Sequence, residues 1–77
     1  MQGTVSSLDM TGHFCPEPVI RVNQEIGKIG MGELLELLAD DPSSRSDIES
    51  WARRTGHELL SAEYEDDHFR FLIRRTN

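Results

Sequence analysis

The apolar residues of this sequence switch repeatedly between the two-residue period of a β-strand and the longer period of an α-helix. The strand period occurs first in Val5 to Met10 and again in Glu33 to Ala39, which is too short for a helix between its flanking turns. Two later runs, Leu60 to Tyr64 and Phe69 to Ile73, carry apolar side chains at every second position. Asp66-Asp67 joins these two runs as a short hairpin turn. The pattern therefore predicts four strands.

The first helical segment begins at Cys15-Pro16-Glu17-Pro18, because prolines are tolerated in the first turn of a helix, where their missing N–H groups would have no partner. Apolar residues then recur at helical spacing for about four turns. Gly30 and Gly32 help to stop the helix. Its apolar face consists of Val19, Val22, Ile26 and Ile29.

The second helical segment lies between the Asp40-Asp41-Pro42 run and Gly56. Asp41 or a nearby serine is predicted to cap its N-terminus, and Ser46-Asp47-Ile48-Glu49 also has the spacing of a capping box. Gly56 is a good C-terminal stop. The inward face contains Ile48, Trp51, Ala52 and Thr55.

The resulting order, β-α-β-α-β-β, predicts an α+β fold. We expect a two-layer α/β sandwich in which two helices cover one face of a four-stranded mixed sheet. With only two helices to cover the sheet, its other face should be at least partly exposed to solvent. The length of 77 residues allows one domain, spanning residues 1–77.

Composition excludes several classes of protein. The net charge is −6, with 14 acidic and 8 basic side chains, which argues against direct nucleic-acid binding. No apolar run approaches the roughly 20 residues of a membrane span. A single cysteine cannot form an internal disulfide or a thiolate-rich zinc site, so we expect no metal and no cofactor. The N-terminus lacks the features of a secretory signal, and we expect a cytoplasmic monomer.

Cys15 is the most informative residue, because it lies at the junction between the first strand and the first helix. The positive end of the helix dipole favours the thiolate, which is the nucleophilic form, whereas Glu17 opposes it weakly. The sign of the pKa shift therefore stays open, and a buried, inert cysteine is the plainer alternative. A reactive single thiol cannot complete a disulfide cycle within the chain, but it can carry a persulfide or thioester. This favours a carrier over an oxidoreductase.

The segment Leu8 to Val19 contains Cys15-Pro16-Glu17-Pro18 and resembles the CPxP signature of the TusA/SirA/YedF family of sulfur carriers. The similarity continues at Ala39-Asp40-Asp41-Pro42, at Asp47-Ile48 and at His57-Glu58-Leu59, so it covers nearly the whole chain. The Asp-Asp-Pro run is closest to the TusA branch. His13 departs from the family pattern, which often has an apolar residue there.

The resemblance implies that Cys15 accepts sulfane sulfur from a cysteine desulfurase or rhodanese and passes the persulfide to a thiol of an acceptor such as a DsrE-like protein. Downstream uses in the family are tRNA 2-thiolation, molybdenum cofactor synthesis and sulfur oxidation. The motif and docking residues would be Pro16, Glu17, Pro18, Asp40 and Asp41.

Plainer roles stay open for several of these residues. Asp40 and Asp41 suit strand termination and helix capping, although Asp41 would face Cys15 if the first two strands run parallel. His13 could lower the pKa of the Cys15 thiol through an ion pair, or it could be an exposed loop histidine. His57 is expected to be structural or solvated, and His68 exposed.

Two other functions compete with sulfur carriage. One is a thiol enzyme acting alone, which the sequence disfavours because no base or oxyanion donor is evident beside Cys15. The other is a regulatory or nucleic-acid-binding module with a structural cysteine. The acidic charge and the absence of interleaved basic and aromatic residues argue against that module.

Overall fold

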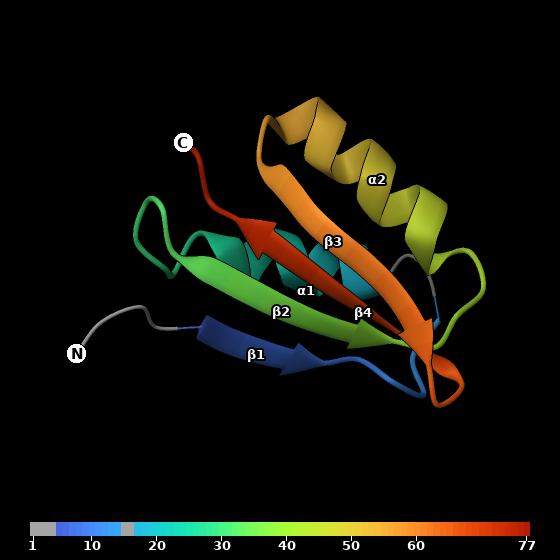
Figure 1. The fold of residues 1–77 in the computed structure, drawn as a ribbon. Coiled ribbons are helices and arrows are strands. Elements are labelled where there is room, and N and C mark those ends of the chain that lie inside the picture. Colours follow the sequence, from blue (N-terminus) through green and yellow to red (C-terminus); the bar gives the residue numbers. More distant parts are fainter. Residues whose placement is uncertain (1–4, 15–16) are drawn as a thin grey trace.

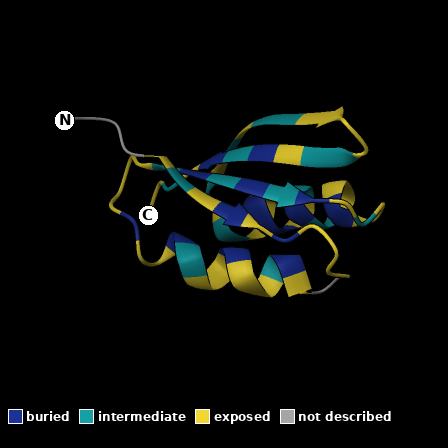
Figure 2. Ribbon diagram, turned by 90° about the horizontal axis from the view of Figure 1, so that it is seen from below, coloured by how far each residue is buried: buried dark blue, intermediate teal, exposed yellow. Residues whose placement is uncertain are grey.

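Four strands form one mixed sheet, and both helices pack on the same face of it in the computed structural model, which describes residues 5–14 and 17–77 (Figures 1 and 2). The strand order is β1-β2-β4-β3, with β1 parallel to β2 and the other pairs antiparallel. This confirms the predicted two-layer α+β sandwich. In chain order the elements are β1 (Val5–Asp9), α1 (Glu17–Ile26), β2 (Leu34–Ala39), α2 (Ser44–Thr55), β3 (Glu58–Glu65) and β4 (His68–Arg74).

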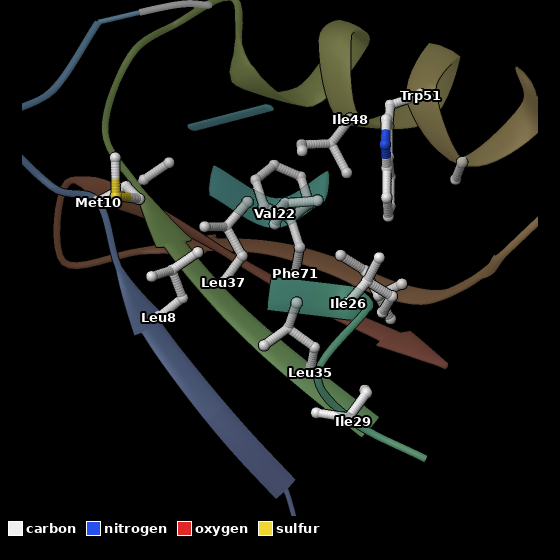
Figure 3. Packing of buried hydrophobic residues seen from close by; sticks show 13 residues of the cluster. Leu8, Met10, Val22, Ile26, Ile29, Leu35, Leu37, Ile48, Trp51 and Phe71 are labelled. Carbon is white, nitrogen blue, oxygen red and sulfur yellow. The ribbon is translucent and has the colours of Figure 1, made fainter. Parts of the chain in front are cut away.

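The hydrophobic core lies between the sheet and the two helices (Figure 3). Alternate residues of the central strands point into it, so the two-residue period of β2 buries Leu35 and Leu37 completely. Val22 of α1 and Trp51 of α2 close the core from the helix side. Trp51 satisfies its buried indole by donating Nε1–H to Asn23 Oδ1 at 3.0 Å, which links the two helices.

The opposite face of the sheet carries charged side chains, as expected for an uncovered face. Glu36 on β2 accepts hydrogen bonds from Arg70 on β4 and from Ser7 Oγ on β1, the latter at 3.0 Å. These two donors hold the pKa of the Glu36 carboxyl below its usual value, with Arg70 the larger cause. Arg70 also contacts Glu63 on β3 at 3.6 Å, so the ion pairs link β2, β4 and β3, and the Ser7 hydrogen bond extends this network to β1.

Helix α1 is shorter than predicted, because it ends at Ile26 and Ile29 lies beyond it. The guanidinium of Arg75 donates hydrogen bonds to the carbonyl oxygens of Ile29 and Gly27, the latter at 3.4 Å. These carbonyl groups therefore find a partner outside the helix. Ile29 is still buried in the core, as its place in the apolar pattern indicated.

The capping box predicted at Ser46–Glu49 is wrong, because helix α2 begins before it. The N-cap is Ser43, and Ser46 lies inside the helix, where its Oγ donates to the Ser43 carbonyl oxygen at 3.2 Å. The C-terminal stop at Gly56 is confirmed. Gly56 adopts φ +86°, a left-handed conformation that glycine tolerates well, and its N–H donates to the Ala52 carbonyl oxygen at 2.9 Å.

Strand β3 has a different phase from the predicted one at its start. An irregularity of register between Leu59 and Ser61 places Leu59 against the core and leaves Leu60 42% exposed. The predicted inward alternation therefore fails at Leu60 and resumes at Ala62, which packs against the core.

The topology brings several turns to each end of the sheet (Figure 1). We call one end the loop end; it consists of residues 11–14, 40–43 and 65–68, where β1 and β2 finish and the β3–β4 hairpin turns. We call the other end the strap end; it consists of residues 27–33, 55–58 and 75–77. Parallel pairing of β1 with β2, in which Asp9 lies opposite Leu38, explains why the two strand-to-helix connections meet at the loop end.

Candidate functional site

The β1–α1 loop is held closely by its own residues. Met10 N–H donates to the Leu38 carbonyl oxygen at 2.7 Å, which extends the sheet one residue beyond β1. The carboxylate of Asp9 then accepts hydrogen bonds from Thr11 N–H at 3.0 Å and Thr11 Oγ1 at 2.7 Å. Both bonds lower the pKa of Asp9, the side-chain bond most. Gly12 follows with φ +86°, a left-handed conformation that glycine adopts without strain.

Asp40 connects this loop to the end of β2. Its Oδ1 accepts the N–H of Gly12 at 2.9 Å, across 28 positions of sequence. The parallel register of β1 and β2 makes this contact, because both strands end at the same edge. Strand termination or helix capping, and a part in docking, were predicted for Asp40. The structure adds another role, because the Asp40 carboxylate fixes the loop that precedes Cys15.

Asp41 supports the start of α2. Its Oδ1 accepts hydrogen bonds from Ser43 N–H and Ser43 Oγ, both at 2.9 Å, and its carbonyl oxygen accepts from Ser44 N–H at 2.9 Å. The predicted association of Asp41 with the helix terminus is therefore correct, although the N-cap itself is Ser43. The two neighbouring acids act on different segments: Asp40 holds the β1–α1 loop, and Asp41 holds the α2 start.

The described residues on either side of the cysteine are also tied together. Glu17 N–H donates to the Phe14 carbonyl oxygen at 2.9 Å, and the Glu17 carboxylate lies 2.9 Å from His13 Nδ1. Pro18 is buried in the first turn of α1, whereas Phe14 is 75% exposed. Cys15 and Pro16 lie outside the described residues, so the expected contacts of His13 and Asp41 with the thiol stay predictions.

The other two histidines lie apart from this loop. His57 packs against Trp51 with ring centroids 5.4 Å apart, and burial together with Arg75 lowers its pKa. It is structural, as expected. His68 is half-buried rather than exposed, and its Nδ1 lies 3.1 Å from the Asp66 carbonyl oxygen. Within residues 5–14 and 17–77, no three metal-ligating side chains gather, and neither helix has the length and apolar content to span a bilayer.

A hollow beside Asp40 was not predicted. It has a volume of about 280 Å³ and is lined by Asp40, Pro42, Tyr64 and Phe69. Tyr64 and Phe69 face each other across the β3–β4 hairpin, and their ring centroids are 4.8 Å apart. The alternation of apolar residues placed Tyr64 and Phe69 at apolar positions of their strands. Only the register of the hairpin shows that the two residues lie opposite each other.

Comparisons with known proteins agree with this architecture. The family model described as Sulfurtransferase TusA matches residues 6–75. A sulfur carrier protein TusA from Pseudomonas syringae is 40% identical over 94% of this chain and 86% of its own length. One from Allochromatium vinosum is 35% identical over 90% of this chain and 91% of its own length.

The fold has also been seen before. A crystal structure of a SirA-like protein from Desulfitobacterium hafniense superposes with a TM-score of 0.81, covering 96% of this chain and 100% of that one at 24% identity. That likeness supports the fold, whereas the sequence matches carry the family. This chain therefore belongs to the TusA family.

Proposed function

We propose that this chain is a sulfur carrier that holds sulfane sulfur as a persulfide on Cys15. The observation that carries the proposal is the position of the chain's single cysteine in a CPxP motif of a TusA-family protein. With no second cysteine in the chain, a sulfur atom on Cys15 must leave to another molecule.

The two transfer steps balance without any added oxidant or reductant. The Cys15 thiolate attacks the terminal sulfur of a persulfide on a cysteine desulfurase or rhodanese, and the donor cysteine leaves as a thiolate. An acceptor thiolate, such as that of a DsrE-like protein, then attacks the terminal sulfur on Cys15. The Cys15 thiolate is regenerated, and the oxidation state of the transferred sulfur is kept throughout.

The described surroundings of Cys15 support this chemistry. Phe14 before it and Glu17 after it are exposed, so a partner has access to the flanking chain. Helix α1 begins at Glu17, and the positive end of its dipole favours a thiolate close to its first turn. The hydrogen bonds of Asp40 and Glu17 hold the loop, which reduces the ordering cost when a partner docks.

The remaining parts of the proposal follow from the same family. Residues 1–77 would act as one sulfur-carrier unit, a cytoplasmic monomer with no cofactor or metal and no direct contact with nucleic acid. The docking surface would be shaped by Pro16, Glu17, Pro18, Asp40 and Asp41. His13 would modulate the thiol by forming an ion pair that lowers its pKa. The downstream use would be tRNA 2-thiolation, molybdenum cofactor synthesis or sulfur oxidation.

Loading is tested by intact-mass analysis after incubation with a cysteine desulfurase and L-cysteine. The wild-type chain should gain the mass of one sulfur atom, and a reducing agent should remove it. Cys15→Ser is the matched control, because it replaces only the sulfur atom by oxygen. Sulfur uptake by the Cys15→Ser chain would reject the proposal.

A further inference from the structure

The hollow at the loop end has the features of a receptor for a positively charged side chain. It is lined by two aromatic residues, Tyr64 and Phe69, together with Pro42 and the acidic residue Asp40. Aromatic faces and a carboxylate are the groups that bind a guanidinium, through cation–π contact and charge-assisted hydrogen bonds.

The walls of the hollow are firmly held and still accessible. Phe69 stacks on the buried Phe71 with ring centroids 5.7 Å apart, which anchors it to the core. Tyr64 packs edge-on against Phe69 and is 60% exposed. One carboxylate oxygen of Asp40 accepts the Gly12 N–H, so a residue that lines the hollow also holds the loop leading to Cys15.

The charges around the hollow specify the sign of the occupant. The loop end and the residues that border it carry seven carboxylates: Asp9, Glu17, Asp40, Asp41, Glu65, Asp66 and Asp67. Two arginines on neighbouring elements are already engaged, since Arg45 binds Glu49 and Arg70 binds Glu36 and Glu63. The surface is therefore complementary to a basic partner and repels phosphate groups.

We propose that a basic partner protein in the sulfur transfer inserts an arginine side chain into the hollow between Tyr64, Phe69 and Asp40. This inference rests on the proposed sulfur-carrier function and adds the chemistry of the partner's surface. Because Asp40 lines the hollow and also binds the loop at Gly12, an arginine bound there positions the partner next to the chain that precedes Cys15.

Two peptides test the proposal without requiring sulfur transfer. The ¹⁵N-labelled Cys15→Ser chain is titrated with Ac-Ala-Arg-Ala-Arg-Ala-amide and with its counterpart in which citrulline, a neutral isostere, replaces both arginines. The arginine peptide should shift the amide signals of Tyr64, Phe69 and Asp40 in a saturable way. Its affinity should exceed that of the citrulline peptide by about tenfold, because only the guanidinium is charged.

Two loop-end variants and one strap-end control show where the arginine peptide binds. Tyr64→Ala should abolish the shifts, and the pair Asp66→Asn/Asp67→Asn should weaken binding about threefold while Asn tolerates the positive φ of both turn residues. The control pair Glu33→Gln/Glu58→Gln removes the same charge at the strap end and should leave binding unchanged.

Several results would overturn the inference. Equal binding of the citrulline peptide, shifts outside the hollow, or an equal loss in both charge-removal pairs would show that no cation site exists there. Concentration-dependent shifts of Tyr64 and Phe69 without peptide would show that a second copy of the chain occupies the hollow. Normal sulfur loading of Cys15 alongside any of these results would reject the arginine site alone, whereas failed loading with normal peptide binding would reject only the sulfur carrier.

Discussion

The loop end and the strap end are both built from short connections, but their polar side chains bind different parts of the chain. At the strap end Arg75 binds the carbonyl groups of Gly27 and Ile29, Thr76 Oγ1 donates to the Gly56 carbonyl oxygen at 2.6 Å, and Asn77 Nδ2 donates to that of Thr55 at 3.0 Å. At the loop end the acids Asp9, Asp40 and Asp41 bind the short loops themselves and remain exposed or half-buried.

The difference indicates a division between holding the fold and meeting partners. The strap end joins the last residues of the chain to two distant turns, so its bonds connect segments that would otherwise separate. Apart from the bond between Gly12 and Asp40, the side-chain bonds of Asp9 and Asp41 at the loop end are local, and this end exposes carboxylates and the Tyr64 ring around the loop that precedes Cys15. Damage at the strap end should therefore cost stability, and damage at the loop end should cost transfer.

Arg75→Ala gives the largest expected effect. It removes the donor to the carbonyl groups of Gly27 and Ile29, which follow α1, and the free energy of unfolding should fall by about 1.5–3 kcal/mol, the usual range for a hydrogen bond that involves a charged group. Urea denaturation measures it. Arg74→Ala, which removes only the exposed pair with Glu58, is the control and should cost about 0–1 kcal/mol. Equal losses in the two variants would remove the special role of the strap end.

Asp40→Ala should have a smaller effect on stability, about 1 kcal/mol, because one hydrogen bond to an exposed loop is lost. Its main consequence should be faster hydrogen exchange of the Gly12 amide and slower sulfur loading of Cys15. Asp40→Asn keeps an acceptor oxygen for Gly12 and should preserve slow exchange. Fast exchange in both variants would show that the Asp40 carboxylate does not hold the loop through this bond.

Much of the fold could be predicted because neighbouring residues determine it. The two-residue period of β2 and the helical spacing of Val22 and Ile26 correctly give the element order and the buried faces. The exact ends of α1 and α2 were less readable. Arg75, 46 positions from Ile29, binds the Ile29 carbonyl group beyond the end of α1, a contact that no local pattern reveals.

The site divides in the same way. The sequence motif named Cys15 and the acids Asp40 and Asp41 as candidates. It did not predict that Asp40 binds Gly12, because that contact depends on the parallel register of β1 and β2. The pairing of Tyr64 with Phe69 depends likewise on the hairpin register. The candidate residues can therefore be named from local sequence motifs, whereas the contacts that these residues make across strands can be known only from the folded structure.

The rates at which Cys15 reacts with a cationic and with an anionic disulfide report the electrostatic field at the thiol, and they therefore test which end of the sheet sets that field. The Cys15 thiolate attacks one sulfur of the disulfide, forms a mixed disulfide and expels the other half as a thiolate. The ratio of the rate with the dication cystamine to the rate with the dianion dithiodipropionate should fall about twofold in Asp66→Asn/Asp67→Asn at low salt. Glu33→Gln/Glu58→Gln should leave the ratio unchanged. A larger change from the strap-end pair would contradict the prediction that the loop-end carboxylates set the field at Cys15.

The smallest expected effect concerns pH at the strap end. Burial and Arg75 lower the pKa of His57 in the folded chain, so the unfolded chain binds the proton more readily. Its contribution to stability is therefore complete above the ordinary histidine pKa and is lost as the pH falls through the lower, folded pKa. Urea denaturation between pH 5 and pH 8, compared with His57→Gln, measures this, and a slope that survives the substitution would exclude His57 as its source.

Cyanolysis of the loaded chain tests sulfur carriage at an accessible Cys15 most directly. Cyanide removes the terminal sulfur of a persulfide as thiocyanate and regenerates the thiolate. After loading by a cysteine desulfurase and removal of the donor, the folded chain should release stoichiometric thiocyanate at a rate close to that of the same chain in denaturant. Release that requires denaturant, or that persists in Cys15→Ser, would contradict an accessible persulfide on Cys15.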